Sequence, residues 1–368
     1  RSNMVIYTHE DPIKVQYYHL LDEVPHLRIA FCPLRALDFD GDFVNFYTAK
    51  IRAVGTVDRV ILDDLTEARS LDEVDLLIDN LVHVCDISRN DIVFINGGDY
   101  ASKHVISYPT FYNLGEFRLL KYDKDTVVPW QDRDNLIISL ARRPTWNRVG
   151  LTVELIKRGL TEYSIISCGS DSESVDNQWI DFFVSSKLQH HFPLLVDGLI
   201  SRHDESFLNE KGFSNAFINV VSESSYEPLP GGDIIYQKLQ GPRPNWWQQW
   251  DRLFVTEKTT KAIAMRQIPI FNTVQNHVKL MRDLGLDVFD DIVDHSYDEM
   301  SDPLERIQAV ATQVEQLYKR GHDYFKSIPN IQDRLERNVQ QFNHQYNVRL
   351  QDAEHKIREF LNHGHVTL

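Results

Sequence analysis

The stretch that decides the fold is LIISLARRPTWNRVGLTVELIKRGLTEYSIISC, residues 136–168. Two short apolar runs, 136–140 and 163–168, flank an amphipathic segment at 149–157. Apolar runs of this length predict buried strands, and a helix between two of them predicts that the strands run parallel. The stretch therefore predicts a strand–helix–strand unit of an α/β fold.

The same alternation continues on both sides of this unit. On the N-terminal side we expect a helix at 70–84 and strands at 5–8, 27–32, 59–62, 92–95 and 117–122. On the C-terminal side we expect strands at 216–222 and 268–271, and helices at 257–265 and 274–284, the last ended by Gly285. The fold class is thus α/β, with two Rossmann-like, doubly wound domains.

A change in composition marks the expected domain boundaries. A polar stretch at 129–135 separates the two series of strands, and from Asp302 onward the sequence is mostly helical and highly charged. We expect one α/β domain over 1–135, a second over 136–330, and long closing helices over 331–368.

Composition bounds the class of protein. The chain has 368 residues, 42% of them hydrophobic, which is enough for two cores. Its formal net charge of −15 opposes binding to duplex DNA unless basic residues gather on one face. Three widely spaced cysteines argue against a disulfide framework and a zinc site. No apolar run approaches the ~20 residues of a membrane span, so we expect a cytoplasmic protein.

The most informative polar residues lie in the segment Val255-Thr256-Glu257-Lys258, where an apolar run leads into a predicted helix. Thr256 is a favourable N-cap. Free N–H groups at a helix N-terminus favour phosphate, Lys258 adds a positive charge, and Glu257 can accept hydrogen bonds from ribose. The pattern indicates a nucleoside-diphosphate site. The alternative is that Thr256 and Glu257 only cap the helix while Lys258 is solvated.

Four segments together carry a resemblance to a known family. They are VTEK with the following IPI at 268–270, FINVVSESS at 217–225, Asn147-Arg148 at the start of a helix, and LGLDVFDDIVDHSYD at 284–298. Over roughly residues 136–320 the chain resembles the fucosyltransferase family of inverting GT-B glycosyltransferases, and most closely its phage and viral fucosyltransferase-like members. Ser224 stands where the family usually has asparagine.

The resemblance implies a donor-binding domain over 136–330 and an acceptor-side domain over 1–135. The implied donor-binding residues are Arg148, Glu223, Phe254, Thr256, Glu257 and Lys258. Arg148 and Lys258 would bind the diphosphate and Glu257 the ribose, while Phe254 stands where the family has tyrosine. The implied reaction transfers a sugar from a nucleoside-diphosphate sugar to a hydroxyl of a carbohydrate or another acceptor.

The general base that deprotonates the acceptor is expected in the N-terminal domain. Carboxyl ends of parallel strands line the ligand crevice of open α/β sheets. Asp99, after Ile95-Asn96-Gly97-Gly98, and Glu10, after the first strand, are therefore candidates. The alternative for each is a loop or capping role.

We expect no metal cofactor, because two well-placed cations can stabilise the leaving group on their own. Asp38 and Asp40 form the one pattern that indicates a metal ion. In GT-A glycosyltransferases an Asp-x-Asp sequence holds a divalent cation on the donor. An acidic turn in an acidic chain explains the two residues equally well.

Two other functions remain open. A phage-type enzyme that glycosylates hydroxymethylated pyrimidines in DNA would act in the host cytoplasm, and the net charge opposes it. A nucleotide- or sugar-binding protein without catalytic activity would keep the fold and lack the base. Turnover of the donor separates an enzyme from such a binding protein.

Overall fold

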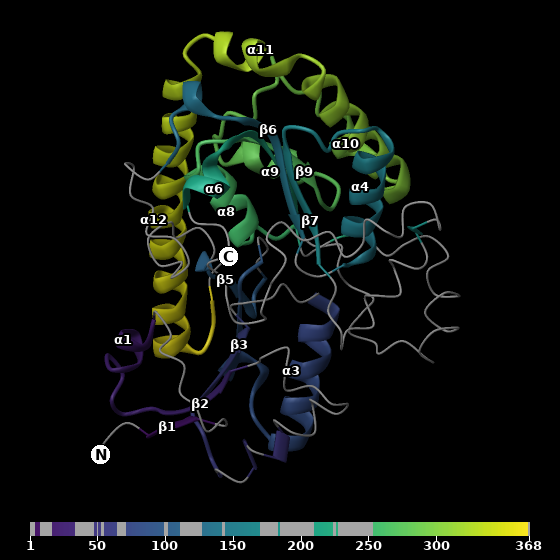
Figure 1. Ribbon diagram of the computed structural model, residues 1–368. Coiled ribbons are helices and arrows are strands. Elements are labelled where there is room, and N and C mark those ends of the chain that lie inside the picture. Colours follow the sequence, from purple (N-terminus) through teal and green to yellow (C-terminus); the bar gives the residue numbers. More distant parts are fainter. Residues whose placement is uncertain are drawn as a thin grey trace. The chain divides into compact units, whose positions relative to one another are not determined.

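The computed structural model describes most of the chain in two compact units. The described residues are 4–7, 17–33, 48–49, 51–52, 55–64, 71–98, 102–110, 127–141, 144–169, 183–184, 210–223, 226 and 253–366. The first unit comprises 1–110, 244–254 and 346–368, and the second comprises 111–243 and 255–345 (Figure 1). The spans expected from the sequence were continuous, whereas each compact unit combines separate segments.

The first unit is built on a five-stranded parallel sheet. Its strands, in spatial order, are β1 (Met4–Tyr7), β2 (Arg28–Pro33), β3 (Arg59–Asp64), β4 (Ile92–Asn96) and β5 (Val105–Ser107). This order follows the sequence without a reversal. The expectation of a doubly wound order is therefore wrong for the described strands of this sheet, because a periodicity pattern predicts strands but not their neighbours.

Apolar side chains cover both faces of this sheet. Ile61 on β3 faces a core completed by α1 (Tyr18–Leu21) and by the far end of the C-terminal helix. Val60 and Leu62 face the opposite core, completed by α3 (Leu71–Cys85). Successive strand residues point to opposite faces, so β3 is buried on both. A short 3-10 helix, η2 (Arg89–Asp91), leads from α3 into β4.

The second unit contains a four-stranded parallel sheet whose order does reverse. The spatial order is β7 (Ser164–Cys168), β6 (Asn135–Ala141), β8 (Ala216–Ser222) and β9 (Ile268–Asn272). The chain moves from β6 to β7 on one side and then returns to place β8 on the other side of β6. Between β6 and β8 lies a topological switch point, where open α/β sheets bind ligands at the carboxyl ends of their strands.

Helices cover both faces of the second sheet. Figure 1 shows α4 (Trp146–Lys157) and α8 (Glu257–Ala264) on opposite sides of the strands. The helix α10 (Pro303–Tyr318) packs on α4 and β9. The other helices among the described residues of this unit are η5 (Trp130–Asp132), α6 (Glu210–Ser214), α9 (His277–Asp283), η9 (Ser296–Glu299) and α11 (Gly321–Ser327). Gly285, at φ +78°, ends α9 as expected.

The C-terminal helix α12 (Ile331–His363) belongs to both units. Its first part buries Leu335 and Phe342, and Arg334 pairs with Asp287 and Asp291 of the second unit. Its last part buries Ile357 and neighbouring apolar residues in the core of the first unit. No side chain is buried between Phe342 and Ala353, and this middle part of the helix is mostly polar, with Arg349 and Asp352 as its charged residues.

The α/β fold class is confirmed, and most elements lie where the sequence places them. The strand expected at 216–222 matches β8 at both ends, and those at 5–8, 27–32, 59–62 and 92–95 match β1 to β4 within one or two residues. The closing helices are also confirmed. The strand expected at 117–122 lies outside the described residues, and β5 was not expected.

A buried arginine holds the second unit together at the amino edge of its sheet. Arg133 is 1% exposed and donates to the carbonyls of Val128, Ala216 and Met265 at 3.3, 2.8 and 2.9 Å. Its guanidinium also lies 4.8 Å from the Trp130 ring. Burial lowers the pKa of Arg133 to about 9. Three separate segments thus depend on one side chain for a hydrogen-bond donor.

Replacing Arg133 by methionine should destabilise the protein by roughly 2–4 kcal/mol, because three carbonyls each lose a hydrogen bond, although that of Ala216 keeps Gln267 as a donor. Urea unfolding measures the loss. The matched control is Arg337→Met at an exposed position of α12, which should change stability by less than about 0.5 kcal/mol. Equal effects of the two substitutions would contradict this account of Arg133.

Candidate functional site

Five polar residues meet at the carboxyl edge of the second sheet, at its switch point. Arg148 lies in the first turn of α4 after β6, Glu223 follows β8 directly, and Thr256, Glu257 and Lys258 open α8. We call these five residues the switch-point site. All five were expected from the sequence. The structure brings them together by hydrogen bonds between residues that are 33 and 75 positions apart in the sequence.

Glu223 is the centre of the switch-point site. Its side chain is fully buried, and Oε1 accepts hydrogen bonds from the Thr256 N–H at 3.0 Å and the Thr259 hydroxyl at 2.5 Å. Oε2 accepts a hydrogen bond from the Thr256 hydroxyl. Both oxygens are therefore engaged by the N-terminus of α8, where the helix dipole favours a carboxylate. Glu223 positions α8 against β8.

Arg148 joins α4 to the end of β8. It is 6% exposed, and its Nη2 donates to the backbone oxygen of Glu223 at 3.5 Å. The nearby Cys168 thiol is not a nucleophile, because burial raises its pKa to about 12 against the opposing effects of Thr152 and Arg148. The Cys168 thiol is therefore protonated at neutral pH.

Lys258 and Glu257 form a half-buried ion pair at the start of α8. Lys258 Nζ lies 2.9 Å from Glu257 Oε1, 3.2 Å from Thr256 Oγ1 and 4.0 Å from Glu223 Oε2. Burial alone would raise the pKa of Glu257, but the charge and hydrogen bond of Lys258, with Lys261, lower it to about 2. Glu257 is therefore ionised at neutral pH and acts only as a hydrogen-bond acceptor.

Thr256 is the N-cap that the sequence predicts. Its hydroxyl accepts from the Lys258 N–H at 3.3 Å. Thr256 does more than cap α8, because the same hydroxyl donates a hydrogen bond to Glu223. Phe254 ends a segment of the first unit, and its side chain is 2% exposed.

Two asparagines at this edge were not expected from the sequence. Asn272, at the end of β9, donates to Ser222 Oγ at 3.1 Å and to the Asn147 backbone oxygen at 3.3 Å. Asn272 Oδ1 and Asn147 Nδ2 are buried and have no hydrogen-bond partner among the described residues. Native proteins pair most buried polar atoms, so such open atoms mark a place for a ligand or a bound water.

Among the described residues, no side chain caps the N-terminus of α4. The Thr145 hydroxyl donates to Asn147 Oδ1 at 2.7 Å and does not accept from the helix backbone. The first N–H groups of α4 are thus left for another acceptor. The signal in the sequence was Thr145-x-Asn147-Arg148 after a strand and a proline.

The expected base candidates Asp99 and Glu10 lie outside the described residues, as do Asp38 and Asp40. The residues just before Asp99 are described. Asn96 ends β4, and its Oδ1 accepts a hydrogen bond from the Gly98 N–H at 2.5 Å. This bond turns the chain at the carboxyl edge of the sheet. The sequence analysis missed Asp63 and Asp64, 7% and 1% exposed at the end of β3. Asp63 accepts a hydrogen bond from the Tyr17 hydroxyl.

Metal-binding and membrane-spanning features were searched for in the described part of the chain. No three His, Cys, Asp or Glu side chains are grouped there in a way that could hold a metal ion. None of the described helices is long and apolar enough to cross a membrane.

Comparison with known proteins adds no family to this geometry. No protein-family model matches the chain, and no curated protein shows significant similarity to it. The function therefore has to be inferred from the switch-point site.

Replacing Glu257 by glutamine should make the protein less sensitive to acid. The folded pKa of about 2 lies below the ordinary value of 4.5. The ionised carboxylate therefore stabilises the fold above about pH 4.5, and this contribution is lost as the pH falls toward 2.

The measurement is the free energy of unfolding of wild type and Glu257→Gln across this pH range. Wild type should be the more stable protein near neutral pH, and the difference should shrink on acidification. Glu162→Gln, at an exposed turn, is the control. A difference that stays constant with pH would show that Lys258 does not hold Glu257 ionised.

Proposed function

We propose that this protein is an inverting GT-B glycosyltransferase that binds a nucleoside-diphosphate sugar at the switch-point site. The observation that carries the proposal is the convergence of two cations on one buried residue. Arg148 contacts the backbone oxygen of Glu223, and Lys258 lies 4.0 Å from its carboxylate. Each cation comes from the first turn of a helix at the switch point, where α/β sheets bind nucleotides.

The electrostatics of the site suit a diphosphate. Two helix N-termini direct their positive ends toward this edge of the sheet, and only α8 is capped by a side chain among the described residues. The open N-terminus of α4 and Arg148 would take one phosphate, and Lys258 the other. The two cations of the switch-point site lie beside two carboxylates in a chain of net charge −15, an arrangement that suits a small diphosphate better than a nucleic acid.

The nucleoside would be recognised by hydrogen bonds to a carboxylate and two side-chain amides. Glu257 is ionised and half-buried, so it can accept two hydrogen bonds from ribose hydroxyls. The open Nδ2 of Asn147 and Oδ1 of Asn272 offer one donor and one acceptor at the same edge. Such paired polar atoms select ligands strongly, because a wrong ligand leaves them unpaired.

In the proposed reaction an acceptor hydroxyl attacks the anomeric carbon as the bond from that carbon to the diphosphate oxygen breaks. Negative charge develops on the leaving diphosphate, where Arg148 and Lys258 would stabilise it without a metal ion. The acceptor proton passes to a carboxylate of the first unit. Asp99 is the proposed base, since it follows the turn at the end of β4.

Binding of the donor is tested first by thermal stabilisation with a panel of nucleoside diphosphates, measured with and without EDTA. A ligand that binds only the folded state raises the melting temperature. One nucleotide should stabilise the wild type, and Lys258→Gln should weaken its affinity about tenfold or more, because a charge-assisted contact is lost.

Lys157→Gln, at the exposed C-terminal end of α4, is the matched control and should bind as wild type does. If no nucleotide stabilises the wild type, or if Lys258→Gln binds equally well, the donor site is refuted. Stabilisation that disappears with EDTA would point to a metal-dependent enzyme instead.

Catalysis is tested with Asp99→Asn. Loss of a general base should lower turnover by roughly 10²- to 10⁴-fold and leave nucleotide affinity unchanged. Asp64→Asn is the comparison, since Asp64 lies buried at the end of the neighbouring strand. Full activity of Asp99→Asn would exclude it as the base. A protein that binds nucleotide but turns over no donor with any hydroxyl acceptor would be a binding protein.

A further inference from the structure

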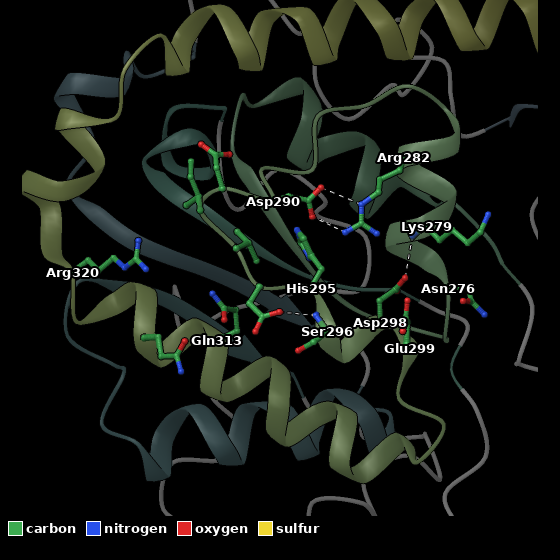
Figure 2. A pocket seen from close by; sticks show the side chains of 15 residues that line it. Asn276, Lys279, Arg282, Asp290, His295, Ser296, Asp298, Glu299, Gln313 and Arg320 are labelled. Carbon is green, nitrogen blue, oxygen red and sulfur yellow. Dashed lines mark hydrogen bonds and ion pairs between the residues drawn. The ribbon is translucent and has the colours of Figure 1, made fainter.

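A second polar site lies in the same unit, away from the residues of the switch-point site. It is a pocket of about 760 Å³ formed by α9, the segment 290–299 and α10 (Figure 2). Pockets of roughly 300–1,000 Å³ are typical of small-molecule sites. We call it the α9–α10 pocket.

Most charged groups of the α9–α10 pocket are already paired within the protein. Arg282 makes two hydrogen bonds to Asp290, at 3.2 and 2.6 Å, and Asp291 pairs with Arg334. Asp298 caps α9 by accepting from the Val278 and Lys279 N–H groups at 2.9 and 3.0 Å. These groups build the walls of the pocket and offer little to a charged ligand.

His295 is also part of the wall and not a proton carrier. Its Nε2 lies 2.7 Å from the Val288 carbonyl oxygen, which can only accept, so Nε2 carries the hydrogen. Nδ1 must then accept from the Tyr297 hydroxyl at 2.8 Å. Burial lowers the pKa of His295, which favours the neutral ring.

What remains for a ligand is a set of uncharged polar groups, the carboxylates of Asp294 and Glu299, and the guanidinium of Arg320, which donates to the Tyr324 hydroxyl. Gln313 on α10 lines the pocket at 7% exposure, and its amide makes no hydrogen bond to any described residue. The side chains of Gln316, Asn276, Ser296 and Glu299 also line it without a hydrogen-bond partner in the described chain. Figure 2 shows Gln313 and Ser296 among the side chains around the cavity.

We propose that the α9–α10 pocket binds a neutral sugar, as a site separate from the one where transfer would occur. An amide both donates and accepts, as does a sugar hydroxyl, so amides, a hydroxyl and a carboxylate match a polyhydroxylated ligand. Five carboxylates and three cations line the pocket, which disfavours an anionic ligand. A ligand hydroxyl could pair with the Gln313 amide, which lines the pocket and makes no hydrogen bond to any described residue.

The probes are neutral methyl glycosides of the common hexoses and the simple disaccharides, tested on the full chain by saturation-transfer NMR. At least one should bind the wild type. Gln313→Leu should weaken binding about tenfold, because a buried amide partner of the ligand is removed. Gln308→Leu, exposed on the same helix, is the matched control and should bind as wild type does. Gln316→Leu provides a second variant at an exposed position of the lining.

Two further binding measurements distinguish sugar binding in the α9–α10 pocket from binding at the proposed donor site. Lys258→Gln should bind the neutral sugar as the wild type does, because Lys258 does not line the pocket. A hexose 6-phosphate should bind more weakly than its parent hexose. No binding of any neutral sugar, unchanged binding by both Gln313→Leu and Gln316→Leu, or loss of binding in Lys258→Gln would each overturn the proposal.

Discussion

The geometry of the proposed donor site depends on the burial of one carboxylate, that of Glu223. An ionised side chain with no exposure is costly unless donors surround it. Here the donors are the backbone and hydroxyl of Thr256 and the hydroxyl of Thr259, all at the start of α8. Because these donors must reach Glu223, the N-terminus of α8 is held against the end of β8. The positions of Glu257 and Lys258 follow from that contact.

Cationic side chains of the second unit lie in two kinds of environment. Arg133 and Arg306 are each 1% exposed and are satisfied mainly by backbone carbonyls. Those two guanidinium groups have structural roles, since their donors are used to join segments. Arg148 also donates to a backbone carbonyl, that of Glu223, but it and Lys258 lie at helix N-termini beside the buried Glu223 side chain. The difference in environment, and not the residue type, distinguishes a structural cation from a candidate ligand-binding one.

Local features were predictable from the sequence, and long-range ones were not. The run at 216–222 matches β8 because seven consecutive strand-forming residues end at a polar turn. β5, with three residues, is too short for any periodicity. The strand order, and the reversal that creates the switch point, depends on contacts that no window of sequence contains. Arg133 lies in a polar stretch that suggested a linker, yet it is buried by segments 83 and 132 residues away.

The site shows the same limit. The residues at the start of α8 and Arg148 were expected from local pattern and resemblance, because each opens a helix after a strand. Asn147 and Asn272 were not, since their open amide atoms become visible only when β9 is placed beside α4. Asp63 and Asp64 were missed because the predicted strand ended at Leu62, two residues short of the end of β3.

The shared helix α12 has a consequence for biosynthesis. The core of the first unit needs Ala353, Ile357, Phe360 and Val366, although the strands it covers end at Ser107. On the ribosome those strands emerge with one face of their sheet uncovered. At 5–20 residues per second, roughly ten to fifty seconds pass before the covering residues are made. During that interval the apolar side chains that these residues later cover stay partly exposed, and the second unit can complete most of its own core first.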